Sequence, residues 1–444
     1  MMLRDVLSTV LTRAVAELLE VVLQGCIAPF YASMHRRDER LAMFASRRDL
    51  DRTVGAIDNH RMLVVILLAL AVQFIARDTA VAGASLVLGV QDRRLDIDLE
   101  SSLDGESVLS QSVDNSQTSL RATYTWDIGE SFTVVATGGG ASSYLGLNDT
   151  RLNGATDLRV RALYQPNDRL VVGAGTVVPM GLYELSANEV VAAQWVWNPR
   201  SGFPLSRFGE GWGWELTSAY SIPITPNVSG GLAAAYLRHA EFDLLGEDTG
   251  LYRLGDELSL SGAIDWRLGS SRSLLLHGAL RRFGSDELSG AEFVQKGVQI
   301  SGGGTAYVPF GAYFLRCGAK ASYQGDNTFT RADGDTLAIS EAAGSRIGLD
   351  MRIGRGTSDR VFVYLDGLVS FVTGTDYDIP VNGTVFSVGP GFGWRIGKPF
   401  SLGARFLWLT SSSDPVIRQT ADGEQETSLD YTGTDVLVTL EFRP

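Results

Sequence analysis

From about residue 83 to its end, the chain repeats one pattern: an alternating strand, a tight turn, a second alternating strand and a longer polar loop. Residues 257–268, for example, place Leu258, Leu260 and Ile264 on one face and Asp265 on the other. The same alternation recurs in residues 119–126, 346–353 and 435–442. Successive side chains of a strand point to opposite faces, so each segment predicts a strand with one apolar and one polar face.

The connections between these segments alternate in length, which predicts both strand number and topology. Seven short turns fall at 127–131, 166–168, 223–227, 269–272, 309–312, 355–359 and 397–399. Eight longer stretches fall at 101–116, 145–153, 180–210, 239–256, 284–291, 324–342, 374–382 and 411–427. Seven turns and eight loops connect about sixteen antiparallel strands, with the short turns on the periplasmic side.

The two faces of the segments distinguish a membrane barrel from a soluble sandwich. The polar face is rich in Arg, Asp, Ser and small residues, while aromatic residues gather on the apolar face near strand ends. Glycine is also abundant, at 50 of 444 residues, which disfavours a helical protein because glycine destabilises helices. We therefore predict an all-β fold, a single transmembrane antiparallel β-barrel over 83–444 with about 16 strands. If the segment 84–100 instead plugs the lumen, the count becomes 14.

One apolar segment predicts export. Arg61 precedes the apolar run at 62–75, and Ala80-Val81-Ala82 follows it. A basic flank, a short apolar core and a small-residue cleavage site are typical of a secretory signal, and the run is shorter than a membrane-spanning helix needs. We predict a signal peptide at 62–82 in a Gram-negative protein of the outer membrane. An inner-membrane anchor is the alternative reading.

Residues 1–61 precede this signal and form an N-terminal extension. The segment 35–52 is crowded with Arg, Asp and Glu. Either the extension is real, or translation starts nearer Met34, Met43 or Met62.

Composition excludes several kinds of site. The formal net charge of −13 argues against nucleic acid, which requires a basic surface. Cys26 and Cys317 are the two cysteines, so neither a disulfide framework nor a zinc cluster is expected. Asp326-Asn327 with Asp333-Gly334-Asp335 lacks the spacing of a calcium loop. We predict no metal site, no cofactor and no catalytic residue.

The polar faces of the strands supply the candidate site, a lining of charged residues around a hydrated lumen. Unpaired charge in a dry interior would cost several kcal/mol per ion, so many charges of both signs favour a wet conduit. Arg–Asp ladders that brace the wall are the compatible alternative. The predicted pore-lining residues are Arg121, Arg159, Arg161, Glu215, Asp265, Arg267, Arg316, Lys320, Arg346, Asp350, Arg352, Asp366, Arg405 and Glu441.

The longest loop, 180–210, is unusually apolar. Residues 185–196 could form a short helix, and Ala192, Ala193, Trp195 and Trp197 are the apolar residues near it. The loop either folds inward as a constriction or covers an entry site; alternatively it is a lid on the barrel rim or on lipopolysaccharide.

Local strings resemble the phenol-degradation MetA-pathway outer-membrane channels, a family similar to the long-chain fatty-acid channels. The strings are LNDTRL at 147–152, VPMG at 178–181, FGEGWGW at 208–214 and YRLGDEL at 252–258. Met180 stands where the family usually has Thr, and the Asn-Pro-Ala motif of fatty-acid channels is absent near residue 83. The resemblance implies passive uptake of small apolar or aromatic molecules.

The predicted function is a channel that passes small solutes or hydrophobic compounds. Its expected partners are outer-membrane lipid, lipopolysaccharide, the barrel-insertion machinery and the solute. That machinery reads a C-terminal aromatic residue, here Phe442, although Arg443-Pro444 follows it. The alternatives are a structural or adhesive barrel that acts through its loops, and a barrel hydrolase. A hydrolase would need His239 or His277 beside a serine and a carboxylate.

Overall fold

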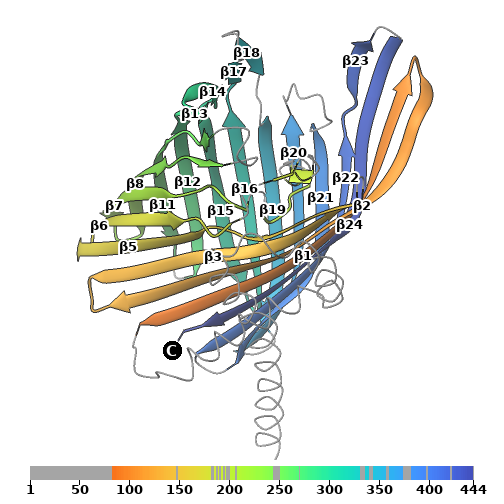
Figure 1. Cartoon of the computed structure of the whole chain (residues 1–444). Helices are drawn as coiled ribbons and strands as arrows, with labels where there is room; N and C mark the ends of the chain where they lie inside the picture. Colours follow the sequence, from red (N-terminus) through yellow and green to blue (C-terminus); the bar gives the residue numbers. More distant parts are fainter. Residues whose placement is uncertain are drawn as a thin grey trace, which may run out of the picture. The chain divides into compact units, whose positions relative to one another are not determined.

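The computed structural model describes residues 83–444 except 147–148, 182–184, 187–188, 190–191, 194–195, 197–200, 206–207, 244–250, 270, 331–335, 340–343, 357–359, 374–381, 397–398, 421–422 and 444. The predicted extension at 1–61 and signal segment at 62–82 lie outside the described residues. The described part is an antiparallel β-barrel (Figure 1).

Sixteen strands form the wall of the barrel. They are β1 (Ala84–Leu103), β2 (Glu106–Ile128), β3 (Phe132–Leu145), β5 (Leu158–Asn167), β6 (Leu170–Val178), β7 (Gly213–Thr225), β8 (Val228–His239), β11 (Glu257–Leu268), β12 (Arg272–Phe283), β15 (Gln299–Phe310), β16 (Tyr313–Gln324), β19 (Ser345–Gly356), β20 (Val361–Thr373), β21 (Gly383–Ile396), β22 (Phe400–Ser413) and β24 (Gly423–Phe442). Two short strands continue this wall, β4 (Thr150–Ala155) beside β3 and β23 (Val416–Thr420) beside β24.

The first and last strands close the barrel. β1 pairs with β2 along one edge and with β24 along the other, from Leu86 opposite Phe442 to Leu103 opposite Gln425. Closure gives every wall strand two neighbours, which is what lipid demands of a spanning sheet. The predicted all-β barrel of sixteen strands is confirmed. The alternative of fourteen strands with residues 84–100 as a plug is wrong, because this segment is a wall strand.

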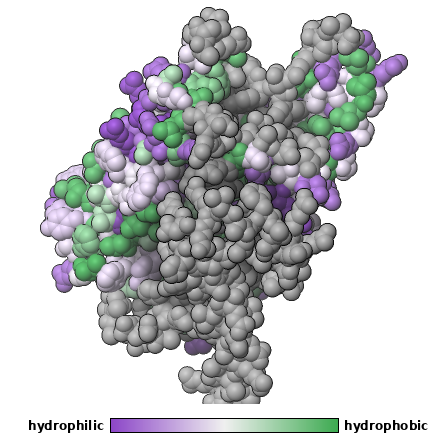
Figure 2. All heavy atoms as spheres, viewed as in Figure 1, coloured by the Kyte–Doolittle hydropathy of each residue, from purple (hydrophilic) through white to green (hydrophobic). Residues whose placement is uncertain are grey.

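The outer face of the wall is apolar. On β11, Leu258, Leu260, Ile264 and Trp266 are each 44–46% exposed, and the outward residues of β19 and β20 continue the band. Figure 2 shows polar side chains gathered over β13 and β14 at the upper left and frequent apolar ones lower on that face. A closed barrel with a continuous apolar exterior is the structure a strand protein needs to span a bilayer. The chain is therefore an outer-membrane type of barrel.

The short turns lie where they were predicted, at the barrel end that holds the start of β1 and the end of β24. Gly269 and Gly311 have φ angles of +86° and +64° in two of these turns. Only glycine adopts that conformation freely, and so these turns can reverse the chain within a few residues.

Several of the predicted long loops are instead partly strand. The stretch 101–116 was expected to be a loop, but β1 and β2 continue through it to a tight turn at Asp104 and Gly105. Above the lipid both faces of a strand meet water, so its polar sequence does not differ from that of a loop. β4 likewise begins inside the predicted loop 145–153, and β23 occupies part of 411–427.

Three other predicted loops, 239–256, 284–291 and 324–342, contribute to a second sheet of six strands. These strands are β9 (Phe242–Asp243), β10 (Leu251–Arg253), β13 (Ser285–Leu288), β14 (Ala291–Gln295), β17 (Asn327–Thr330) and β18 (Thr336–Ile339). Each follows or precedes a wall strand, so this outer sheet extends the wall on the long-loop side (Figure 1). Arg253 on β10 donates a side-chain hydrogen bond to Glu287 on β13. This bond links the two strands and raises the pKa of Arg253.

Candidate solute pathway

The strand register places the predicted lining on one face of the wall, opposite the apolar band. Arg316 pairs with Arg352 across β16 and β19, and Arg352 pairs with Asp366 across β19 and β20. Directly paired residues lie on the same face of a sheet. All fourteen predicted residues follow this rule, and because the other face is the lipid-facing one, this is the inner face of the barrel.

Seven of the fourteen inner charges form ion pairs with one another, some between neighbouring strands and some across one intervening strand. Arg161 Nε lies 2.9 Å from Glu215 Oε2, and Arg316 Nη2 lies 3.4 Å from Asp350 Oδ2. A larger group is centred on Asp366, whose carboxylate accepts bonds of 2.6 and 2.8 Å from Arg352 and lies 3.9 Å from Arg405. The pairs brace the wall across strands and offset part of the charge of the lining, whose fourteen residues comprise nine basic and five acidic side chains.

The remaining members of the predicted set differ in their surroundings. Arg159 lies 3.8 Å from Glu210, a residue of the longest loop. Glu441 accepts a 3.1 Å hydrogen bond from Ser401 and forms an ion pair with Arg443. Lys320 is exposed on the inner face of β16. Within the described residues, no side-chain acceptor is found for Arg121, Arg267 or Arg346.

The loop 180–210, called the inward loop below, packs against the inner face of the barrel. Its described residues Glu189, Ala192, Ala193 and Val196 are helical. Ser186 starts this helical segment, since its backbone N–H and its hydroxyl both donate to Glu189 Oε2, at 2.8 and 2.7 Å. The bond from the Ser186 backbone N–H to the Glu189 side chain is one half of a capping box. The helical residues that follow Ser186 therefore have a local sequence cause.

Apolar side chains attach the inward loop to the wall. Ala192, Ala193 and Val196 are at most 4% exposed, and Phe203 and Phe208 are 7% and 8% exposed. They form one cluster with wall residues of β1, β2, β3, β4, β22 and β24, namely Leu95, Ile97, Val113, Ala141, Leu145, Leu152, Leu409, Leu429 and Tyr431. Burial of one such large side chain contributes roughly 1.5–3 kcal/mol. These partners lie on the inner face, so the packing favours a loop folded inward over a lid on the barrel rim.

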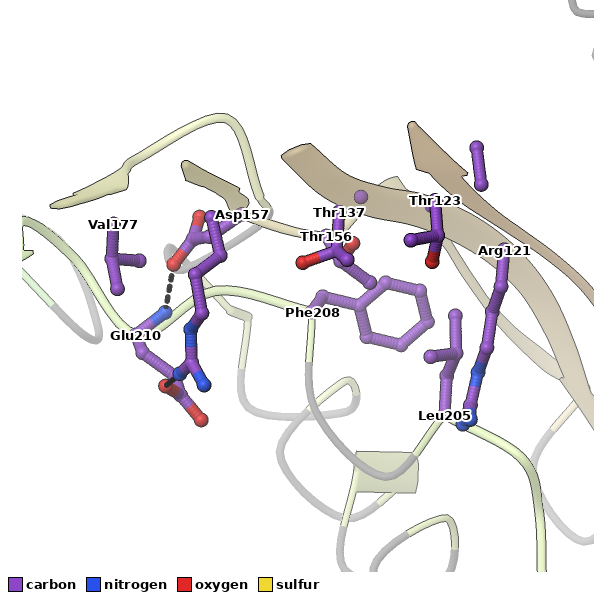
Figure 3. A pocket seen from close by; sticks show the side chains of 13 residues that line it. Arg121, Thr123, Thr137, Thr156, Asp157, Val177, Leu205, Phe208 and Glu210 are labelled. Carbon is purple, nitrogen blue, oxygen red and sulfur yellow. Dashed lines mark hydrogen bonds and ion pairs between the residues drawn. The ribbon is translucent and has the colours of Figure 1, made fainter. Parts of the chain in front are cut away.

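Asp157 fastens both ends of the inward loop. Its Oδ1 accepts hydrogen bonds from the backbone N–H groups of Met180 and Gly181, at 3.1 and 2.8 Å. Its Oδ2 accepts a 2.5 Å bond from the backbone N–H of Glu210 (Figure 3). A Cβ atom at Gly181 would lie 2.1 Å from the Phe208 carbonyl oxygen, so only glycine permits this approach. No sequence pattern indicated this role for Asp157, because its partners are backbone groups.

Two further polar side chains of the wall bind the middle of the inward loop. The Gln117 side chain donates to the Leu205 carbonyl at 2.8 Å and accepts from its N–H at 2.9 Å. Arg93 donates to the Ser201 carbonyl at 2.9 Å and pairs with the fully buried Asp435. Asp435 also accepts bonds of 3.0 and 2.8 Å from Gln91. The charges beneath the loop are thus neutralised by one another.

The inner faces of β1, β2, β3, β22 and β24 therefore form a covered wall, whereas the inner faces of β11, β12, β15 and β16 form an open wall. On the open wall, His277 and Lys320 are exposed and Leu275 is 43% exposed. On the covered wall, Gln117 and Asp435 are completely buried. Exposure of inward side chains shows that water reaches the lumen along the open wall.

A cavity of about 390 Å³ lies where the inward loop meets the wall. Strands β2, β3, β5 and β6 supply one side of it, and Leu205, Phe208 and Glu210 of the inward loop supply the other (Figure 3). Two predicted lining residues, Arg121 and Arg159, contribute to the cavity. The structure thus brings these two together and leaves the other twelve distributed around the wall.

An aromatic row on the inner face was not predicted. The ring centroids of Tyr307 and Phe314 are 5.9 Å apart, those of Phe314 and Phe362 6.4 Å, and those of Phe362 and Tyr364 6.0 Å. The Arg352 guanidinium lies 3.9 Å from the Tyr364 centroid. Glycines make room for this row, since a Cβ at Gly391 or Gly393 would lie within 2.3 Å of the rings of Tyr364 or Phe362. Glycines at every second position could have signalled it.

The two histidines of the barrel are the candidate bases of an enzyme site. His239 is 2% exposed, and neither of its ring nitrogens has a hydrogen-bond partner within the described chain. His277 lies against Gly303 on the open wall. Among the residues described, no group of three or more potential metal ligands is close enough to bind an ion. No helix in the described ranges is both long and apolar enough to cross a membrane.

Comparison with known proteins finds similar folds. No family model matches the sequence, and no curated protein matches it. Solved structures that resemble it include a Pseudomonas aeruginosa FadL homologue, with a TM-score of 0.41, 11% identity, and coverage of 81% of this chain and 90% of that one. The P. putida toluene transporter TodX has a TM-score of 0.36, with 10% identity and coverage of 82% and 90%. The COG4313 outer membrane channel from Pseudomonas putida F1 has a TM-score of 0.34, with 10% identity and coverage of 81% and 96%.

Proposed function

We propose that the protein is an outer-membrane channel through which small solutes pass along the open wall, beside the inward loop. The observation that carries this proposal is the contrast between the two walls. An adhesive or structural barrel has no need of a water-exposed inner face, and a packed lumen would bury such side chains as Lys320 and His277.

The charged lining supports passage of polar or amphipathic solutes. Ion pairs such as Arg316–Asp350 and Arg161–Glu215 offset part of the charge, but the fourteen residues comprise nine basic and five acidic side chains, so the lining offers many donors and acceptors and carries a net positive charge. Rings of charged side chains and constricting loops set the selectivity of wide pores. We propose that the fourteen inner charges line this pathway and that the inward loop narrows it.

A catalytic role has less support. A hydrolase needs a base within hydrogen-bond reach of its nucleophile. In the described part of the chain, neither His239 nor His277 has a hydrogen bond to a serine or to a carboxylate. We propose no reaction for this barrel.

Conductance across a planar lipid bilayer tests the channel. The purified protein should conduct, and deletion of residues 185–197 should raise the conductance of single channels because the inward loop then occupies less of the lumen. Truncation of the β17–β18 hairpin, which lies in the outer sheet, is the matched control and should change the conductance little.

If conductance is small, uptake of a radiolabelled aromatic solute into proteoliposomes distinguishes a narrow channel from a closed barrel. The absence of both conductance and uptake, with and without residues 185–197, would defeat the proposal. A structural barrel would then be the better account.

A further inference from the structure

The cavity beside the inward loop differs from the rest of the lining in how its charges are partnered. Its two carboxylates are already engaged: Asp157 accepts three backbone N–H groups, and Glu210 lies 3.8 Å from Arg159. Arg121 also lines the cavity, and among the described residues nothing accepts a hydrogen bond from its guanidinium. The cavity thus contains one cation whose charge is not compensated locally.

The neighbours of Arg121 explain why it remains free. On β1 its paired residue is Gly89, and on β3 it is Gly139. Other inner arginines have an acidic partner in the wall, Arg352 on the adjacent strand and Arg161 one strand further on. Two flanking glycines leave Arg121 without a partner in the wall and clear the space around its side chain.

The opposite side of the cavity is apolar. Phe208 and Leu205 of the inward loop face Arg121, and Val177 of β6 lies at the other end (Figure 3). Phe208 is held in place, because it belongs to the buried cluster under the loop. Thr123 and Thr137, paired across β2 and β3, add hydroxyl groups to the lining, and the Arg121 side chain extends away from Thr123 toward Leu205 (Figure 3). A cation, two hydroxyls and an aromatic ring therefore line one cavity.

We propose that this Arg121 cavity binds a small aromatic carboxylate, as a selective station on the solute pathway; this inference rests on the proposed channel function. The carboxylate would accept hydrogen bonds from the Arg121 guanidinium, and the ring would pack against Phe208 and Leu205. Guanidinium and carboxylate match in geometry and can form two parallel hydrogen bonds.

Size and charge both fit a monoanion with one ring. A cavity of roughly 150 Å³ is enough to hold benzene, so a space of about 390 Å³ accommodates an aromatic acid with some water. A neutral hydrocarbon would leave Arg121 without an acceptor. A dianion would meet the carboxylates of Asp157 and Glu210 at the same cavity.

Calorimetric titration of the purified full-length protein with benzoate tests the inference without requiring transport. Benzoate should bind saturably, whereas benzyl alcohol (no charge) and acetate (no ring) should each bind at least about tenfold more weakly. Arg121→Gln should weaken benzoate binding about tenfold or more. Arg121→Lys should have a smaller effect, because lysine keeps the positive charge and loses only the two parallel N–H donors of the guanidinium.

Arg395→Gln is the matched control, because Arg395 is an exposed arginine near the turn-side end of β21, outside the cavity. It should leave the binding of benzoate unchanged. Heat-modifiable gel mobility of each variant verifies that the barrel has folded. Conductance without saturable benzoate binding would overturn the inference and leave the channel intact. Equal losses in Arg121→Gln and Arg395→Gln would also overturn it. Benzoate binding by a protein that neither conducts nor takes up solutes would support the site and refute the channel.

Discussion

The covered wall and the open wall are built from the same kind of alternating strand, yet their inner faces are stabilised differently. The covered wall combines apolar residues such as Leu95 and Tyr431 with buried polar groups whose partners are all within the protein. The open wall carries exposed side chains such as Lys320 and His277. One inner face is a protein core and the other is a wetted surface, so the same barrel can be rigid on one side and permeable on the other.

The two walls should differ most in the free energy of unfolding that is lost when an ion pair is broken. Asp435→Ala leaves Arg93 in a buried position without its carboxylate, and loss of one partner of a buried pair costs about 3–5 kcal/mol. Asp350→Ala is the control on the β16–β19 wall, where the partner Arg316 is 43% exposed, and should cost less than about 1 kcal/mol. Unfolding in denaturant, with the protein refolded into lipid vesicles, measures both. Equal losses would show that the inward loop does not seal the covered wall.

The open wall depends on lipid on its outer side for stability. Leu260 is 46% exposed on the outer face of β11, and an arginine at a mid-membrane position of this kind costs roughly 2–4 kcal/mol. Leu260→Arg should therefore reduce membrane insertion and the free energy of unfolding. Asp265→Asn, on the inner face of the same strand, should change stability little. Comparable damage from both substitutions would contradict the register described here.

Asp157 matters to this comparison, because this residue holds both ends of the inward loop that covers one of the two walls. Asp157→Ala removes the acceptor of three backbone N–H groups, and hydrogen bonds to charged groups contribute about 1.5–3 kcal/mol each. Part of that will be recovered from water, so we expect about 2 kcal/mol of destabilisation together with noisier and larger single-channel currents. Asp157→Asn keeps one acceptor oxygen, so its stability and its currents should lie between those of the unsubstituted protein and those of Asp157→Ala. Steady currents in Asp157→Ala would show that the apolar cluster alone fixes the loop.

The smallest effect on stability is expected for an exposed charge of the open wall. Lys320→Gln removes a positive charge from the inner face of β16, and exposed substitutions usually change stability by less than about 0.5 kcal/mol. The preference of the pore should nevertheless shift towards cations, because Lys320 faces the lumen. The reversal potential in a potassium chloride gradient measures this shift. An unchanged reversal potential would indicate that ions do not pass along the open wall.

The sequence predicted the wall strands well because lipid imposes a strict alternation on them. Leu258, Leu260 and Ile264 must all face out of β11, and the short turns that separate such segments limit the strand number to sixteen. Outside the lipid this constraint ends. The polar residues of the β1–β2 hairpin and of the outer sheet form strands with the composition of loops, so the pattern predicted loops there.

For the inner face, alternation along a strand determined which residues point inward, including all fourteen proposed lining charges, but it could not show which of them are covered. Burial of Asp435 and exposure of Lys320 depend on where the inward loop lies, and that is set by contacts between residues more than a hundred positions apart, such as Arg93 with Ser201. The possible helix and the apolar residues of the loop were visible in the sequence. Their partners on six strands, the Asp157 clamp and the glycine-flanked Arg121 were decided only by the tertiary structure, because closing the barrel brings together strands that no local pattern relates.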